Sequence, residues 1–293
     1  MNVFGGSMRV SSNFMNETLS DQIYPHDGKN LNHFKSEFEF AFISFLPFLK
    51  IANKSNLTSN FKKFEIISFQ EAKQNLDILE NISNISGTIY SYSNINYPTD
   101  EEIFESAERI NWSEVVEGAN LENPSELNKA LRTSNGALRK AFQKPALLNK
   151  LESFTNDNKI YHPVEGDFDI LTKKKIYEIL KILNKKEIIV FDEFQENQKV
   201  FDITKLTESE FLNEIESREY HIYSQDKEIL FTIEWDSFFF IIAFNNSKNI
   251  KLVTELFEGF LCNPQTADEW DYKPGEFQKI LRKENKKWWQ FWI

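Results

Sequence analysis

Residues 219–244 read EYHIYSQDKEILFTIEWDSFFFIIAF and contain three strand-like runs in close succession. The runs are Glu219–Tyr223, Ile229–Trp235 and Phe238–Phe244, and each is rich in β-branched and aromatic residues, which favour strands. Short polar stretches separate the runs, as is typical of turns between neighbouring strands. This part of the chain therefore predicts an antiparallel sheet.

The residues on either side of this stretch predict one more strand and several helices. EIIVF at Glu187–Phe191 reads as a strand, and Leu171–Leu183 before it reads as a helix. Thr207 and Glu210 have the spacing of a capping box, which begins a helix. After the last strand, NIKLVTELFEGF predicts a closing helix. We therefore expect residues 159–272 to form an α+β lobe.

The first half of the chain is richer in helix signals. Thr99 and Glu102 form another capping box, and we expect the helix that they begin to end near residue 109. Asn123 followed by Pro124 is typical of a helix start, and this helix should continue to about Phe142.

The four parts of the chain differ in composition and pattern. Residues 1–22 are polar and lack periodicity, so we expect them to be disordered. Residues 34–49 mix helical spacing with strand alternation, which leaves both structures open. A helix-rich lobe at 23–158, an α+β lobe at 159–272 and a basic aromatic tail at 273–293 complete the predicted organisation. The fold class is therefore α+β, a helix-rich N-terminal lobe followed by a mainly antiparallel sheet with helices packed on it.

The balance of charge makes this an acidic protein. The 293 residues include 45 acidic and 34 basic side chains, for a net charge of −11. An acidic surface repels phosphates, so we expect no nucleic-acid partner and favour a basic protein partner. Cys262 is the single cysteine, which excludes an internal disulfide and a cysteine-based zinc site. Because the sequence shows neither a signal peptide nor a membrane-spanning run, we predict a cytoplasmic protein.

Three stretches of the chain resemble a bacterial family. They are YPTDEEIFESAERINWSEV, SELNKALRTSNGALRKAF, and WDSFFFIIAF with the later FEGFLCNPQTADEW. They are similar to the domain of unknown function 2711 family over about residues 95–272, and LRTSNGALRK is the most specific part. The resemblance implies a bacterial, cytosolic protein. It implies no mechanism, because the family has no assigned reaction, cofactor or catalytic residues.

Four residues are candidates for catalytic chemistry. Asp192 and Glu193 directly follow the predicted strand EIIVF, and Asp236 lies between two predicted strands. If these carboxylates converge, with His162 beside them, they would hold a divalent metal for a hydrolase or nuclease. The alternative is that Asp236 is a turn residue and that the acidic residues after His162 are solvated loop charge. Because no cofactor or metal motif is present, we assign neither.

Two arginines are candidates for binding an anion. Arg132 and Arg139 are seven residues apart on a predicted helix and therefore share one face. Paired arginines grip carboxylates or phosphates. The alternative, which we favour, is that they form structural ion pairs with acidic residues of this chain, because no other anion-binding group accompanies them.

The chain ends in KENKKWWQFWI, where Trp288, Trp289 and Trp292 follow a run of lysines. From Lys273 onward, six basic and two acidic residues give the tail a net charge of +4. A buried aromatic side chain hides about 150–250 Å², so we expect the tail to be covered. The body of the protein, a second copy, another protein or an anionic membrane surface would each cover it.

These observations favour a non-catalytic protein–protein interaction module. One example of that class is an immunity-type protein that neutralises a basic toxin or nuclease. The acidic charge, the 28 phenylalanines and the lack of a catalytic motif support this hypothesis. The partner is another protein or a second copy of the chain. Two alternatives stay open, a metal-assisted hydrolase or nuclease with carboxylates at strand ends, and a peripheral membrane protein that binds through its tail.

Overall fold

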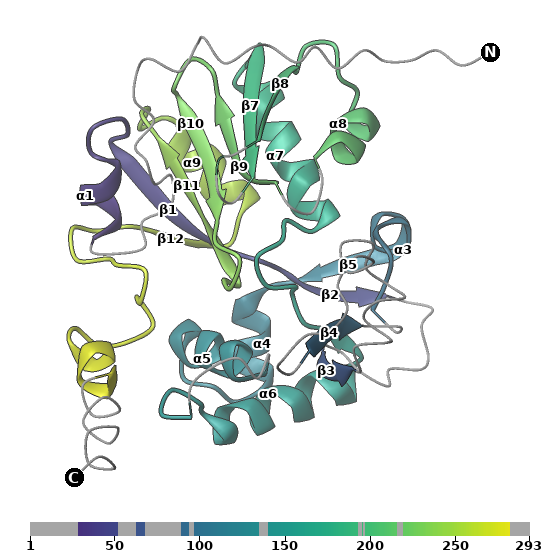
Figure 1. Cartoon of the computed structure of the whole chain (residues 1–293), viewed down its shortest axis with the longest axis vertical. Helices are drawn as coiled ribbons and strands as arrows, with labels where there is room; N and C mark the ends of the chain where they lie inside the picture. Colours follow the sequence, from purple (N-terminus) through teal and green to yellow (C-terminus); the bar gives the residue numbers. More distant parts are fainter. Residues whose placement is uncertain are drawn as a thin grey trace, which may run out of the picture. The chain divides into compact units, whose positions relative to one another are not determined.

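The computed structural model has an α+β fold, as the sequence predicts (Figure 1). It describes residues 29–51, 63–67, 89–93, 97–134, 140–192, 195, 197–215 and 219–281. The predicted disorder of residues 1–22 lies outside this part of the chain. The described residues fall into two compact units. The first unit draws on Met1–Ser44, Gly166–Phe168 and Lys173–Asp268, and the second on Phe45–Glu165, Asp169–Thr172 and Glu269–Ile293.

A seven-stranded sheet forms the centre of the first unit, in the order β12-β1-β11-β10-β9-β7-β8 (Figure 1). Its strands are β1 (Phe40–Phe45), β7 (Glu187–Asp192), β8 (Gln198–Asp202), β9 (Glu219–Ser224), β10 (Ile229–Ile233), β11 (Phe239–Phe244) and β12 (Gly259–Leu261). The pairs β9–β10, β10–β11, β7–β9, β7–β8 and β1–β12 are antiparallel. The antiparallel sheet predicted from residues 219–244 is therefore confirmed.

The central strands of this sheet are buried on both faces. Every residue of β10 and β11 is buried, which explains why these segments are continuous apolar runs rather than alternations. Helix α7 (Ile170–Ile182) precedes β7, and helix α9 (Asn249–Leu256) follows β11. The ring of Phe240 meets Phe168 before α7 and Phe257 after α9, both in edge-to-face contacts. These rings connect the sheet to the ends of both helices.

Residues 34–49 form the end of a helix and most of two strands. The sequence left both helix and strand open for this segment. Helix α1 (Asn30–Phe34) ends before β1, and β2 (Phe48–Ile51) begins directly after Pro47. Proline has no backbone N–H to donate to a neighbouring strand, so it suits a break between strands better than the middle of one. The strand alternation therefore describes most of this segment.

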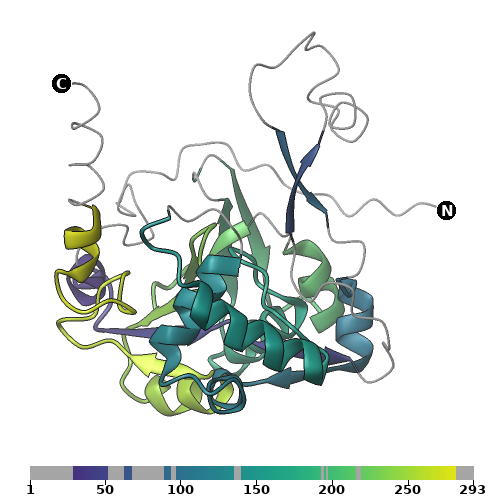
Figure 2. The same cartoon turned by 90° about the horizontal axis from the view of Figure 1, so that it is seen from below.

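The second unit combines helices with two small sheets. Strands β5 (Ala107–Ile110) and β6 (Ile160–Tyr161) flank β2, and β3 (Lys63–Ile67) pairs with β4 (Ile89–Ser93). The helices are α3 (Asp100–Ser106), α4 (Trp112–Gly118), α5 (Pro124–Ser134) and α6 (Pro145–Asn158). Helices α5 and α6 lie side by side (Figure 2).

Both predicted capping boxes are present. The hydroxyl of Thr99 accepts from the N–H of Glu102, whose carboxylate accepts from the N–H of Thr99 at 2.8 Å. The box before α8 (Glu208–Glu214) makes the same two bonds. The expected end of the first helix is wrong, because α3 stops at Ser106 and the next four residues pair with β2 as a strand.

The chain passes between the two units more than once. The sequence prediction instead drew one boundary between the lobes 23–158 and 159–272, and that boundary stays a prediction. Strand β1 shows the contrast, because it belongs to the large sheet although it lies early in the chain. Among the described residues, no helix is long and apolar enough to cross a membrane.

Candidate functional site

An open pocket lies at one end of the large sheet, where β7 begins, β8 ends and β9 turns into β10. Its volume is about 700 Å³. The described residues that line it are polar or charged: Asn184, Lys186, Glu187, Asp202, Thr204, Gln225 and Asp226. Three carboxylates and one ammonium group therefore lie in its wall.

Two tight turns build this wall. After α7, Asn184 adopts a left-handed backbone with φ of 52°, and the chain then enters β7. In the β9–β10 hairpin, Lys227 has φ of 59°, and its N–H donates to the carbonyl of Ser224 at 2.8 Å. The hydroxyl of Ser224 in turn accepts from the N–H of Ile229 at 3.0 Å. The two turns are held by local hydrogen bonds, so their side chains have defined positions.

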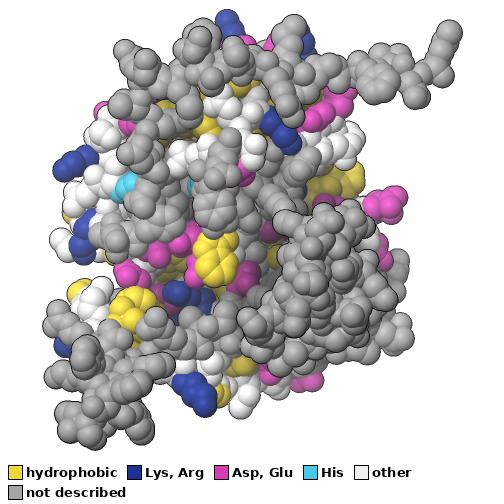
Figure 3. Space-filling model, in the orientation of Figure 1, with side chains coloured by type: hydrophobic (Ala, Val, Ile, Leu, Met, Phe, Trp, Pro, Cys, Tyr) yellow, Lys and Arg dark blue, Asp and Glu magenta, His cyan; other side chains and the backbone are white. Residues whose placement is uncertain are grey.

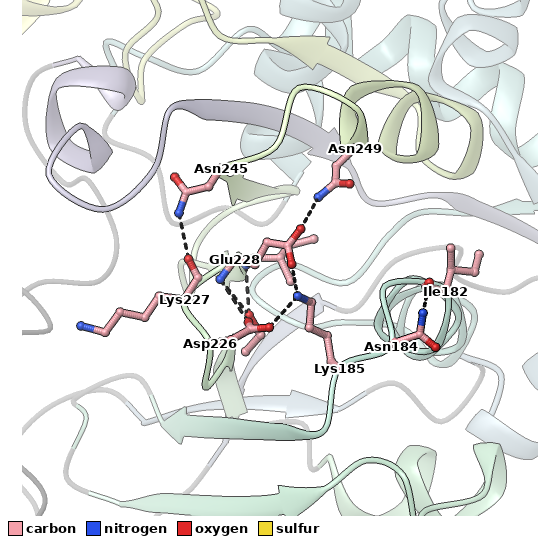
Figure 4. Close-up of polar contacts among 10 residues, drawn as sticks. Ile182, Asn184, Lys185, Asp226, Lys227, Glu228, Asn245 and Asn249 are labelled. Carbon is pink, nitrogen blue, oxygen red and sulfur yellow. Dashed lines mark hydrogen bonds and ion pairs between the residues drawn. The ribbon is translucent and has the colours of Figure 1, made fainter.

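Lys185 joins these two turns through a buried ammonium group (Figure 4). Its side chain is 2% exposed, and its Nζ lies 2.7 Å from Oδ2 of Asp226 and in contact with Oε2 of Glu228. Glu228 also accepts a hydrogen bond of 3.3 Å from Nδ2 of Asn249, the first residue of α9. One lysine therefore ties the α7–β7 turn to the hairpin, and Glu228 extends the connection to α9.

The pKa shifts of Lys185, Asp226 and Asp202 all favour the charged form of the group. Burial disfavours the charged form of Lys185, but its hydrogen bonds to Asp226 and Glu228 outweigh this cost and raise its pKa. Burial likewise acts to raise the pKa of Asp226, yet the hydrogen bond from Lys185 leaves that pKa lowered. The hydrogen bond from Lys205, 2.7 Å from Oδ2 of Asp202, lowers the pKa of Asp202 to about 2. Each shift favours the charged form.

This pattern suits recognition better than proton transfer. A general acid or base works best when its pKa lies near the pH of the reaction. The shifts move the pKa values of Asp226 and Asp202 in the pocket wall, and that of Lys185 beside it, further from pH 7, so the three groups stay ionised. Groups of this kind can fix a charged or polar ligand by hydrogen bonds, and their positions are set by the fold before a ligand arrives.

Asp192 and Asp236, two of the predicted catalytic carboxylates, lie at the opposite end of the same sheet. Asp192 ends β7 and accepts a hydrogen bond of 2.6 Å from Nδ2 of Asn197. Asp236 lies in the turn between β10 and β11, which is the turn position that the sequence offered as its alternative. Glu193 lies outside the described residues. Within the described part of the chain, no group of three His, Cys, Asp or Glu residues is arranged to hold a metal ion.

His162, the fourth catalytic candidate, belongs to the second unit and is buried. Its Nε2 lies 2.9 Å from the hydroxyl of Thr155, and its ring meets Phe48 edge to face. Its backbone carbonyl accepts from the hydroxyl of Tyr97 at 2.8 Å. Burial lowers the pKa of His162 to about 3, so the ring is neutral at pH 7. These contacts fit a packing role.

Arg132, one of the two predicted anion-binding arginines, lies on α5 near a buried carboxylate. Asp271 is 3% exposed, and its Oδ2 accepts from Nδ2 of Asn128 at 3.1 Å. Burial raises the pKa of Asp271, while the charges of Arg132 and Lys129 act against this rise. This proximity fits the ion-pair alternative for Arg132. Arg139 lies outside the described residues, so the pair as a unit stays a prediction.

The start of the predicted tail is part of the second unit and packs within it. The ring of Phe277 lies 4.8 Å from that of Phe142 and 5.4 Å from that of Tyr272, measured between centroids. Phe142 lies in a turn, so the predicted helix does not extend to it, and its ring meets Tyr272 edge to face. Trp288, Trp289 and Trp292 lie outside the described residues, so their contact with a partner or membrane stays a prediction.

Sequence reasoning did not find the pocket around Lys185. The residues of its network come from the α7–β7 turn, a hairpin and a helix start, which are far apart along the chain. No local pattern marks a lysine as buried, since lysines are usually exposed. Opposite charges at the ends of neighbouring predicted helices and strands are the sequence signal that could have suggested this network.

The comparisons with known proteins place the chain in a family. It belongs to the family described as "Protein of unknown function (DUF2711)", which matches residues 26–272. The family resemblance drawn from the sequence is therefore confirmed, and it extends further toward the N-terminus than residue 95. The chain is also similar to "Uncharacterized protein YwbB" of Bacillus subtilis (strain 168), with 25% identity over 175 residues, or 59% of this chain and 77% of that protein. No solved structure matches the chain.

Proposed function

We propose that this protein is a non-catalytic binding protein whose partner is a basic protein. The observation that carries the proposal is the pocket at the end of the large sheet, whose wall contains Glu187, Asp202 and Asp226. Among its described lining residues, Lys186 is the only cation, while Lys185 and Lys205, which are not in that lining, pair with Asp226 and Asp202. Lysine or arginine side chains of a partner are the groups that such carboxylates bind best.

The fixed ion pairs support binding over catalysis. Lys185 is buried between two carboxylates, so it stays charged and positioned, and the exposed Lys205, 2.7 Å from Asp202, favours the charged form of that carboxylate. The net charge of −11 adds a long-range attraction for a basic partner, which speeds encounter at low salt. An immunity-type protein that neutralises a basic toxin or nuclease is one member of this class, and we place the protein in the cytoplasm.

Affinity capture with the full chain tests this proposal. We expect the chain to retain one basic protein in stoichiometric amount from native lysate, and raised salt should release it because the attraction is screened. The variant Glu187→Gln should retain less of this partner. Its matched control is Glu117→Gln, which removes one exposed carboxylate from α4. Recovery of no stoichiometric protein, or equal recovery by both variants, would contradict the proposal.

A further inference from the structure

Trp235 is an unusually exposed aromatic side chain. It is 52% exposed, more than any other large apolar side chain among the described residues. It lies in the turn between β10 and β11, at the end of the sheet opposite the pocket. Tryptophan is the residue most often found as the energetic centre of a protein interface, because its burial removes a large apolar area from water.

The backbone fixes this turn in place. The N–H of Ser237 donates to the carbonyl of Glu234 at 3.1 Å, which closes the turn. The N–H of Gly166 donates to the carbonyl of Ser237 at 2.8 Å. Gly166 has φ of +64°, and a Cβ there would lie 2.2 Å from the carbonyl oxygen of Trp235. Only glycine allows this close approach, so the exposed indole is carried on a fixed backbone.

The charged residues next to Trp235 in the sequence have one sign. Glu234 and Asp236 flank it, and both are partly exposed. The twenty residues from Glu228 to Ser247 contain no lysine or arginine. Asp167 follows the glycine that contacts the turn. Figure 3 shows acidic side chains next to apolar ones on the face that it draws, with Lys and Arg side chains also present there. This arrangement favours a cation and disfavours an anionic lipid surface.

We propose that Trp235 anchors an arginine of the basic protein partner. The guanidinium group stacks on the indole face while Asp236 accepts its N–H groups. Arginine fits better than lysine because its planar group both stacks on an aromatic ring and donates two parallel hydrogen bonds to a carboxylate. This inference rests on the proposed binding function and adds a second contact, separate from the pocket.

Three nonapeptides that differ only at the central residue test the contact. The centre is arginine, lysine or the uncharged citrulline, and the full chain is labelled with ¹⁵N so that its six indole N–H groups are observed by NMR. The variant Trp235→Phe assigns the resonance of Trp235. At low ionic strength, the arginine peptide should shift this resonance most, the lysine peptide less and the citrulline peptide least.

Affinities for a labelled arginine peptide provide the second readout. Trp235→Ala should weaken binding at least about tenfold, as expected for an interface anchor. Asp236→Asn should weaken it about threefold, since one partly exposed ion pair is lost. Gly166→Ala should weaken binding although it keeps the indole, because its Cβ displaces the turn. The matched control is Gly275→Ala, which also has positive φ but meets no atom within 4 Å and should bind as the wild type does.

Two results of the peptide and vesicle experiments would overturn the contact. One is an arginine peptide that leaves the Trp235 resonance in place or that binds no better than the citrulline peptide. The other is a shift of that resonance by phosphatidylglycerol vesicles and not by the peptides, which would make the turn a membrane contact. If the full chain captures a stoichiometric basic protein and Trp235→Ala captures it equally well, the anchor is wrong while the binding function stands.

Discussion

Replacement of Asp271 by asparagine tests how a buried carboxyl group is held. Oδ2 of Asp271 accepts from Nδ2 of Asn128 at 3.1 Å. Oδ1 of Asp271 and Oδ1 of Asn128 are both buried and have no hydrogen-bond partner among the described residues. In Asp271→Asn, we expect the new amide to donate to Oδ1 of Asn128 while its oxygen keeps the existing bond. The substitution therefore satisfies a buried acceptor and removes a buried charge.

Two effects decide the size of the change. A buried acceptor left without a partner costs about 1–3 kcal/mol, which the new amide bond would recover. Against this, the substitution removes the attraction between Asp271 and the charges of Arg132 and Lys129. Burial outweighs that attraction, because the pKa of Asp271 is raised. We therefore expect Asp271→Asn to increase the free energy of unfolding at pH 8 by about 1 kcal/mol.

The pH dependence of the free energy of unfolding provides a second test of whether Asp271→Asn stabilises the protein. Because the pKa of Asp271 is higher in the folded state, the folded state binds its proton more tightly than the unfolded state does. The stability from this proton is fully present below the unfolded pKa and is lost as pH rises through the folded pKa. The wild type should lose this contribution in that window, whereas Asp271→Asn should not. The advantage of the variant should therefore grow with pH.

Urea unfolding at a series of pH values, followed by tryptophan fluorescence, measures both quantities. The control is Asp157→Asn, which changes an exposed carboxyl group on α6 and should leave stability nearly unchanged. A loss of about 3–5 kcal/mol in Asp271→Asn at pH 8 would refute the reasoning, because it is the loss expected when a buried ion pair is broken. Asp271 would then be an ionised partner of Arg132.

Two further predictions concern the first unit. Lys185→Met should lower the free energy of unfolding by about 1–3 kcal/mol, because Asp226 and Glu228 lose their shared counter-charge at a partly exposed site. Urea unfolding measures this loss, and the control is Lys251→Met, which breaks the exposed pair with Glu255 on α9. A loss no larger than that of the control would contradict the prediction. Cys262 in the folded chain should react with iodoacetamide at pH 8 about a thousandfold more slowly than in the unfolded chain, because burial raises the pKa of its thiol to about 12. Equal reaction rates in folded and unfolded protein would contradict this and show that the thiol is accessible.

Local signals made part of the fold predictable from the sequence. A capping box involves residues three positions apart, so the starts of α3 and α8 could be identified without knowledge of the rest of the chain. The apolar runs of β10 and β11 were also visible, because strands buried on both faces lack polar residues. The class of the fold follows from such signals.

The remaining features depend on residues that lie far apart in the sequence. The end of α3 was misplaced because the next residues pair with β2, which lies more than fifty positions earlier. The bond from Asn128 to Asp271 spans 143 positions, and that between Lys185 and Glu228 spans 43. Neither end of such a contact carries a local pattern. The pocket and the buried carboxyl group could therefore be recognised only in the folded chain.

We conclude that the fold holds Asp202 and Asp226 of the pocket as ions, which suits them to binding and not to proton transfer. A pH titration of the carboxyl groups by ¹³C NMR tests it most directly, with Asp202→Asn and Asp226→Asn used to assign the two resonances. The account predicts that both carboxyl groups titrate below the ordinary pKa of aspartate, and that Lys185→Met raises the pKa of Asp226. Titration of either aspartate near pH 7 in the wild type would contradict the claim, because such a group would be ready to act as a general acid or base.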